Sequence, residues 1–200
     1  MSELSDRFDE AVRLIDEANA GDPVMEADGE GGEAARGLLY GRRMSGWLER
    51  VEPDASEAVR LAARAQHIRR WEVPRDTYPM DRRGYHLWRT EMYGFHGRAA
   101  GEILRSVGYG DEMVDRVAEL LAKKGIKSDA EAQLLEDVIC LVFLEHYYSA
   151  FIEGHEDDKV VVILQRTWKK MSERGHEHAL GLAGVIEGRA KELVLRAVSG

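Results

Sequence analysis

The spacing of hydrophobic residues predicts a chain made of helices. From Leu4 to Ile15 apolar residues recur at intervals of three and four, the pattern of a helix with one buried face. The same pattern predicts further helices over residues 36–51, 54–71, 82–106, 110–123, 129–153, 157–172 and 176–198. No stretch of useful length alternates apolar and polar residues, so we expect no sheet. The expected fold is all-α, a single-domain helical bundle of about 7–8 helices spanning residues 1–200.

Prolines and capping residues mark the expected boundaries. No proline follows Pro79, which leaves residues 80–200 free to be helical throughout. Pro74 and Pro79 make residues 72–81 a loop. Pro53-Asp54 is expected to start the helix over 54–71, and Asp129 is expected to cap the helix over 129–153.

Residues 21–35, GDPVMEADGEGGEAA, form the least helical part of the chain. They hold four glycines, one proline and five acidic residues. Glycine and proline interrupt regular structure and the acids favour solvent. We expect a flexible, exposed, acidic loop.

Composition is that of an ordinary globular protein, with 44% hydrophobic and 32% charged residues in 200. Its one cysteine, Cys140, excludes a disulfide framework and fits a reducing compartment. The acidic start, MSELSDRFDE, is unlike a signal peptide, and no apolar run approaches the roughly 18 residues of a membrane helix. We therefore expect a cytoplasmic protein that does not bind a membrane.

The net charge of −9 is unevenly distributed. Residues 1–35 carry 11 acids and 2 arginines, whereas residues 36–105 carry 14 arginines and 9 acids. All seven lysines lie after residue 120, so the basic groups of the middle segment are guanidinium groups alone. An acidic protein is poorly suited to generic nucleic-acid binding. A local concentration of arginine instead indicates a defined site for phosphate or carboxylate.

Arginines alternate with aromatic residues between Arg64 and Arg98. Eight arginines stand against four acids in these 35 residues. On the expected helix over 82–106, Arg82, then Tyr85 or His86, and then Arg89 share one face. The segment predicts an anion-binding wall, the alternative being arginines paired to nearby acids on a solvated surface.

A second candidate set is His67, His96 and Asp137, on three different expected helices. Asp137 precedes the apolar run Val138–Leu144, so if it faces inward it must be paired or bound. Histidine and carboxylate from separate helices are ligands suited to a divalent metal. They also serve as general acid and base without one. Isolated buried histidines satisfied by their neighbours are the structural alternative.

Several common catalytic signatures are missing. The chain has no GxxxxGK[ST], GxGxxG, CxxC, HExxH or GxSxG sequence. Nucleotide hydrolysis by a P-loop, dinucleotide binding and serine hydrolysis are therefore not expected.

Five segments carry a family resemblance: LLYGRRMSGWL, RLAARAQHIRRWEVPRDTYPMDRRGYHLWRT, FHGRAAGEIL, LEDVICLVFLEHY and RTWKKMS. They resemble the bacterial and fungal domain of unknown function family numbered 4202, from about residue 5 to residue 180. That resemblance supplies no activity.

The order of elements is also similar to the HD-domain superfamily of metal-dependent phosphohydrolases, an all-helical bundle. The resemblance assigns His67 to the histidine of the His-Asp pair, Asp137 to the late aspartate, and His96 to an additional histidine. The chain departs from the pattern because Ile68 follows His67, and because helix 36–51 offers Arg42 and Arg43 in place of a histidine. A cation in a ligand position repels a metal, so the resemblance implies a degenerate metal site.

The leading hypothesis is that the chain binds, and turns over if it is catalytic, a phosphorylated small molecule or nucleotide. His67, His96 and Asp137 are the candidate catalytic residues. The candidate ligand-binding residues are Arg42, Arg43, Arg69, Arg70, Trp71, Arg75, Arg82, Tyr85, Trp88 and Arg89.

Two alternatives stay open. The first is a metal-dependent phosphohydrolase in which His67, His96 and Asp137, with Glu145 or water, hold Mg²⁺, Mn²⁺, Fe²⁺ or Ni²⁺. The second is a non-catalytic assembly protein whose arginines pair with an acidic partner, such as the N-terminal region of another subunit in a homodimer.

Overall fold

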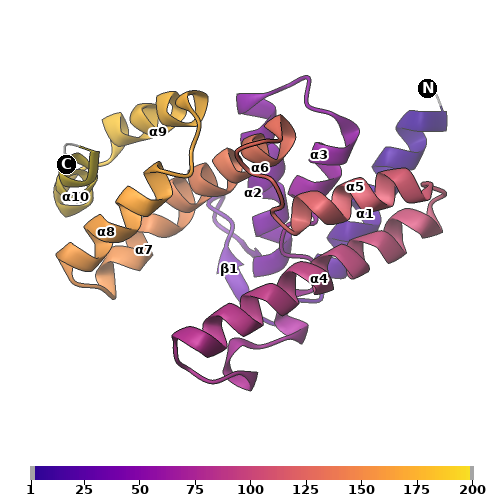
Figure 1. The fold of residues 1–200 in the computed structure, drawn as a ribbon, viewed down its shortest axis with the longest axis horizontal. Helices are drawn as coiled ribbons and strands as arrows, with labels where there is room; N and C mark the ends of the chain where they lie inside the picture. The colour runs from indigo at the N-terminus through magenta and orange to yellow at the C-terminus, as the bar shows by residue number, and fades with distance from the viewer. Residues whose placement is uncertain (1–2, 199–200) are drawn as a thin grey trace.

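Helices make up most of the protein (Figure 1). The structure is a computed structural model that describes the backbone of residues 3–198 and the side chains of residues 6–184 and 186–198. The elements are α1 Glu3–Ala20, β1 Met25–Ala27, β2 Glu33–Ala35, α2 Arg36–Val51, α3 Glu57–Arg64, η1 Arg70–Glu72, η2 Arg75–Thr77, α4 Arg82–Ser106, α5 Asp111–Leu121, α6 Ala130–Val142, η3 Phe143–Tyr147, α7 Tyr148–Glu153, α8 Asp157–Trp168, α9 Glu173–Val185 and α10 Gly188–Val198. The expected all-α class is confirmed, with one small hairpin added to it.

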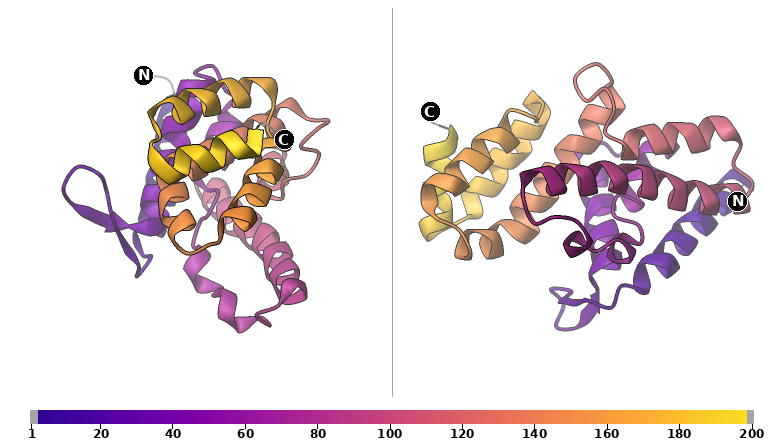
Figure 2. Two further views of the ribbon diagram at one scale, coloured as in Figure 1. Left: turned by 90° about the vertical axis from the view of Figure 1, so that its left-hand side faces the viewer. Right: turned by 60° about the horizontal axis from the view of Figure 1, so that its bottom comes forward.

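That hairpin replaces the flexible loop expected over residues 21–35. Strands β1 and β2 pair antiparallel with Met25 opposite Ala35, and they project away from the helices (Figure 2, left). Asp28 closes the turn by accepting the backbone N–H groups of Glu30 and Gly32. The expectation of no sheet was wrong because strands of three residues are too short to show a period of two.

The main hydrophobic core joins α1–α6 with α9. Its fully buried side chains include Ile15, Met44, Leu61, Leu121 and Leu141. A smaller second cluster joins α7, α8 and α10 around Tyr148 and Leu193. In Figure 1 these later helices gather at the end of the molecule opposite α1 and α5.

Helices α4 and α5 lie side by side as an antiparallel pair (Figure 1). Two glycines of α4 face α5. A Cβ at Gly97 would lie 3.3 Å from Ala118, and one at Gly101 would lie 3.0 Å from Val114. The absence of side chains at these positions lets the two backbones approach closely, and this fixes α4 along the site described below.

The helix expected over residues 54–71 is wrong at both ends. Ser56, rather than Pro53-Asp54, caps α3 by accepting the N–H of Val59, and the helix ends at Arg64. Residues 65–69 are turns, and Arg69 has a left-handed backbone with φ of 52°. The N–H of Arg69 donates to the side chain of Asn19 on α1. This tertiary contact overrides the helical spacing, and the turn carries His67 and Arg70 towards a cavity.

Two further expected helices are divided, so the described chain has ten α-helices rather than about 7–8. The helix expected over 129–153 begins with Asp129 as its cap, as expected. It is then interrupted by the π-helical turn η3. The last helix is broken between Val185 and Gly188, whose φ is +59°. In the described residues no helix is long and apolar enough to cross a membrane.

Candidate functional site

Two cavities meet at His67, Arg70 and Trp88, which line both of them. The larger has a volume of about 690 Å³ and the smaller about 230 Å³. Together they fall in the size range of small-molecule sites. The walls come from segments far apart in the sequence: the start of α2, the turn after α3, α4, and the region from α6 to η3.

The larger cavity is mainly apolar and contains several aromatic side chains. The π-helical turn η3 contributes Phe143 and Tyr147. Such π-helical turns within α-helices occur frequently at functional sites. The residues lining this cavity are Asp22, Pro23, Val24, Arg36, Gly37, Tyr40, His67, Arg70, Trp71, Val73, Pro74, Arg75, Trp88, Ile139, Phe143 and Tyr147.

The smaller cavity is mainly polar and cationic. Its lining residues are Gln66, His67, Arg70, Tyr85, Trp88, Arg89, Met92, Tyr93, His96, Lys123 and Lys170. Four of these carry a positive charge and none carries a negative one. The arrangement therefore favours an anion.

Arg70 joins the two cavities. Its guanidinium lies over the ring of Trp88, 4.5 Å from the ring centroid. Within the described residues it has no salt-bridge or hydrogen-bond partner. Burial lowers the pKa of Arg70, because water is removed from its charge and no carboxylate of the described residues pairs with it. An arginine in this condition is able to bind an incoming anion without first breaking an ion pair.

Trp88 is itself held in place. Its side chain is 7% exposed, and its Nε1–H donates to the carbonyl oxygen of Val73 at 2.9 Å. The ring is thereby fixed between the loop over residues 72–81 and α4, and it presents a face on which Arg70 stacks.

The other cations of the smaller cavity are only partly neutralised. Glu136 on α6 is buried and contacts Lys123 at 2.7 Å and Lys170 at 3.5 Å. Arg89 donates to the Tyr93 hydroxyl and contacts no carboxylate among the described residues. One buried carboxylate thus serves two lysines, while Arg70 and Arg89 remain available to a ligand.

The two histidines lie close together, with ring centroids 6.0 Å apart. His67 stacks on Tyr40 at 3.9 Å, and its pKa is held well below the usual value by burial and then by Arg70. Burial also lowers the pKa of His96 to about 4. Both rings are therefore neutral at physiological pH.

His96 has one fixed tautomer. Its Nδ1 lies 2.9 Å from the carbonyl oxygen of Ile68, and a carbonyl oxygen only accepts hydrogen bonds. Nδ1 therefore carries the hydrogen of the neutral ring, and Nε2 is an acceptor. Neither His96 Nε2 nor Oε1 of Gln66 has a partner among the described residues, although both atoms are buried.

Asp137 does not lie with the histidines, and the expectation that the three converge was wrong. Its carboxylate accepts from the backbone N–H of Ser172 at 2.8 Å and also from the Ser172 hydroxyl. Gln133 donates to the same carboxylate at 3.0 Å. Asp137 thus ties α6 to the start of α9. A Cβ at Gly175 would lie 2.8 Å from this carboxylate, so the contact also requires glycine there.

The expected metal site is not formed. In the described part of the chain no three histidine, cysteine or acidic residues are grouped so as to hold a metal ion. Glu145, the expected additional ligand, instead accepts from Trp47 Nε1 at 2.7 Å and lies 2.8 Å from His146. His67 and His96 share the cavity with cations, which repel a metal.

Six of the ten expected ligand-binding residues line the cavities. They are Arg70, Trp71, Arg75, Tyr85, Trp88 and Arg89. Arg75 has a structural role as well, because it donates to the carbonyl oxygens of Tyr78, Pro79 and Asp81 and so shapes the loop over 72–81.

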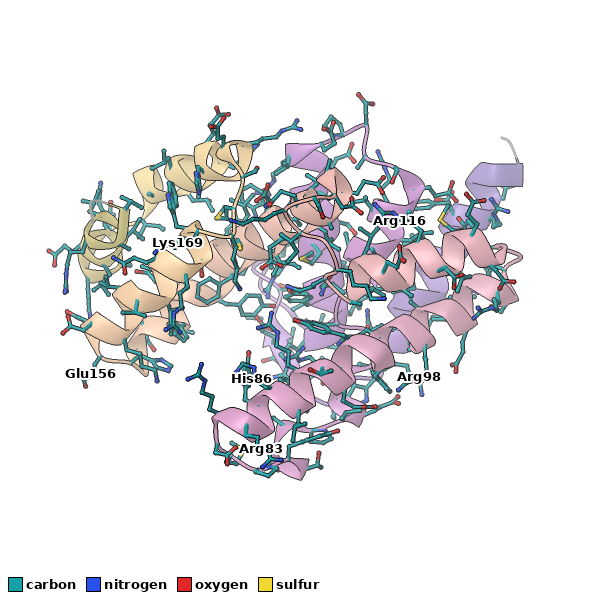
Figure 3. The ribbon with its side chains drawn as sticks, in the orientation of Figure 1. Arg83, His86, Arg98, Arg116, Glu156 and Lys169 are labelled. Atoms are coloured by element: carbon teal, nitrogen blue, oxygen red, sulfur yellow. The ribbon has the colours of Figure 1, made fainter. Side chains whose placement is uncertain are left out.

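The other four arginines lie outside the cavities. Arg42 is exposed, 3.9 Å from Asp16, and Arg69 pairs with Glu72 at 2.6 Å. Arg43 pairs with Glu26 at 2.7 Å. Arg82 is exposed at the start of α4, in the stretch that also carries the surface residues Arg83 and His86 (Figure 3).

Sequence reasoning missed several residues of the site. They are Arg36, Tyr40, Gln66, Lys123, Tyr147 and Lys170. Lys123 and Lys170 resembled ordinary helix-terminal lysines. A signal for them did exist, because Glu136 occupies a buried position of the apolar helix α6 and a buried carboxylate requires a cation.

The family model of the domain of unknown function DUF4202 matches residues 9–194. The chain belongs to this family. The match covers every residue that lines the two cavities, so the site lies wholly within the family's domain. No curated protein and no solved structure matches the chain.

Proposed function

We propose that this DUF4202 protein binds a phosphorylated small molecule or nucleotide in the two joined cavities. The observation that carries the proposal is the state of Arg70. It is a largely buried guanidinium that stacks on Trp88 and has no acidic partner among the described residues. A buried charge is costly unless it is paired, and a bound phosphate supplies the missing partner.

The two cavities divide the ligand by chemistry. The phosphate lies in the smaller one, against Arg70 and Arg89, with Lys123 and Lys170 adding positive charge. A base, ring or sugar lies in the larger one against Trp71, Trp88 and the other aromatic side chains. Each desolvated arginine contact of this kind stabilises a complex by about 1.5–3 kcal/mol.

The geometry favours binding over metal-dependent hydrolysis. Asp137 is engaged by Ser172 and Gln133, and the cavity that contains His67 and His96 also contains four cations. Any turnover would depend on the histidines as proton carriers rather than on a metal held by the three expected ligands.

The acidic N-terminal region also favours a small-molecule ligand over pairing between subunits. Asp16 pairs with Arg64, Asp22 lies 3.8 Å from Arg36, and Glu26 pairs with Arg43, all within one chain. These three acids therefore already have partners within the chain, whereas Arg70 and Arg89 in the smaller cavity have none among the described residues.

We propose that the fold is a degenerate HD-like bundle. In this interpretation the position of the missing aspartate has a new role. The Ile68 side chain is fully buried in the core, and its carbonyl oxygen orients His96. Arg42 and Arg43, in place of an early histidine, pair with acids on α1 and the hairpin.

A thermal-shift panel tests the proposed function. Nucleoside monophosphates and sugar phosphates are compared with the same compounds lacking phosphate. At least one phosphorylated member should raise the melting temperature by binding the native state, and its counterpart should not.

Two neighbouring substitutions make the panel specific. Arg70→Gln should lose the response, while Arg69→Gln should keep it because Arg69 pairs with Glu72 outside the cavities. A panel with no shift, or an Arg70→Gln protein that responds like the wild type, overturns the proposal.

A further inference from the structure

Two buried hydrogen-bond acceptors stand without partners beside the smaller cavity. Gln66 is 3% exposed and His96 is 2% exposed, and both line it. Gln66 Oε1 and His96 Nε2 have no hydrogen bond in the described structure. Buried polar atoms in native proteins are almost always paired. Two such atoms on one cavity therefore indicate a group that is missing from the protein itself.

The missing group is a donor. His96 Nδ1 carries the ring hydrogen because it faces the Ile68 carbonyl oxygen, so His96 Nε2 presents a lone pair. An ionised phosphate oxygen is also only an acceptor and does not pair with that lone pair. The fully ionised phosphate group of a monoester would neutralise Arg70 and Arg89 but would leave Gln66 and His96 unsatisfied.

Donors and acceptors are thus both needed in the ligand. The cations require negative oxygens, whereas the two buried acceptors require O–H or N–H groups close to those oxygens. A hydroxylated carbon chain or sugar ring next to a phosphate has both. Hydroxyl groups also suit a neutral histidine, because an O–H group donates to the lone pair of Nε2 without protonating the ring.

We propose that the site selects phosphorylated compounds that carry free hydroxyl groups near the phosphate, and that these hydroxyls donate to His96 Nε2 and Gln66 Oε1. The inference rests on the proposed function, since it assumes that Arg70 and Arg89 bind the phosphate. It adds the substrate class, a polyol or sugar phosphate or a nucleotide with an intact ribose.

The selection follows from the buried acceptors. A ligand that lacks the hydroxyls leaves both atoms desolvated and unpaired, and sites built to hydrogen-bond a hydroxyl reject such analogues strongly. We expect a loss of affinity of about 10-fold or more for each analogue without hydroxyls.

Calorimetric titration of two matched ligand pairs tests the inference. Glycerol 3-phosphate is compared with propyl phosphate, and adenosine monophosphate with its 2′,3′-dideoxy form. The hydroxylated member should bind more tightly in at least one pair. Equal affinities within every pair that binds overturn the inference and leave the proposed function standing. If no member of either pair binds, the inference fails, and the proposed function fails with it only if no phosphorylated compound of the thermal-shift panel binds.

Two variants locate the preference. His96→Asn keeps a donor able to reach the Ile68 carbonyl oxygen and removes the Nε2 acceptor, and Gln66→Met removes the other acceptor at similar size. Each substitution should reduce the difference in affinity between the two members of a ligand pair. Arg69→Gln should leave that difference unchanged. A preference that survives both substitutions overturns the assignment, and thermal unfolding establishes that each variant is folded.

Discussion

The guanidinium of Arg70 lies 4.5 Å from the centroid of the Trp88 ring, and among the described residues it forms no ion pair with a carboxylate. Stacking on an indole compensates only part of the lost hydration of a guanidinium. The pair is therefore better suited to a liganded protein than to an empty one. Of the other arginines between Arg64 and Arg98, Arg64, Arg69 and Arg98 have acidic partners.

The first prediction concerns stability without ligand. Arg70→Met should leave the free energy of unfolding unchanged or raise it by about 1 kcal/mol, because an apolar side chain fills the space without a desolvated charge. Urea unfolding measures this directly. Arg64→Met is the matched control, since Arg64 is also partly buried but pairs with Asp16. It should cost about 3 kcal/mol. An equal loss in both variants contradicts the account.

The second prediction assigns Asp137 to stability rather than to binding. Asp137→Asn weakens the hydrogen bonds from Ser172 and Gln133, and should lower the free energy of unfolding by about 2 kcal/mol. Ligand affinity should stay within about twofold of wild type, because the residue does not line the two joined cavities. Asp115→Asn, at an exposed position of α5, is the control for both measurements. If the Asp137→Asn protein has normal stability but has lost ligand binding, Asp137 belongs to the binding site and the prediction is wrong.

The third prediction concerns pH. The pKa of His96 is about 4 in the folded protein against the usual 6.5, because burial disfavours the charged ring. The unfolded chain therefore binds more protons than the native protein between these values. The contribution of neutral His96 to the free energy of unfolding is therefore fully present above pH 6.5. It is lost as the pH falls towards 4, and the total loss is about 3 kcal/mol.

His96→Asn isolates this contribution. The difference in unfolding free energy between wild type and the variant should shrink as the pH falls from 6.5 to 4. Urea unfolding at a series of pH values gives this difference, and the common effect of the acidic residues cancels. A difference that does not vary with pH would mean that His96 is not buried as a neutral ring.

Local patterns predicted the fold where local forces determine it. The helices over 36–51 and 82–106 were predicted with the bounds that α2 and α4 have, and Asp129 caps α6 as expected. The helix over 54–71 failed because its second half is fixed by a contact between Arg69 and Asn19, 50 residues apart. Apolar spacing carries no information about such a partner.

The site was predicted only in part, again because contacts between distant residues do not show in local sequence patterns. The arginine-rich segment does contain Arg70 and Arg89, and Trp88 lies between them. Composition could not show that Arg43 meets Glu26 across 17 residues and so leaves the site. Likewise, the position of Asp137 indicated a buried carboxylate correctly, but its partner Ser172 lies 35 residues further along the chain.

The affinity of Arg70→Gln for a phosphorylated ligand tests the central claim most directly. Calorimetry with the compound that gives the largest thermal shift should show binding weakened by about 10-fold or more, the loss of one charge-assisted contact. Arg69→Gln, one residue away and paired with Glu72, should bind within about twofold of wild type. If the two variants bind alike, Arg70 does not hold the ligand and the proposed site is wrong.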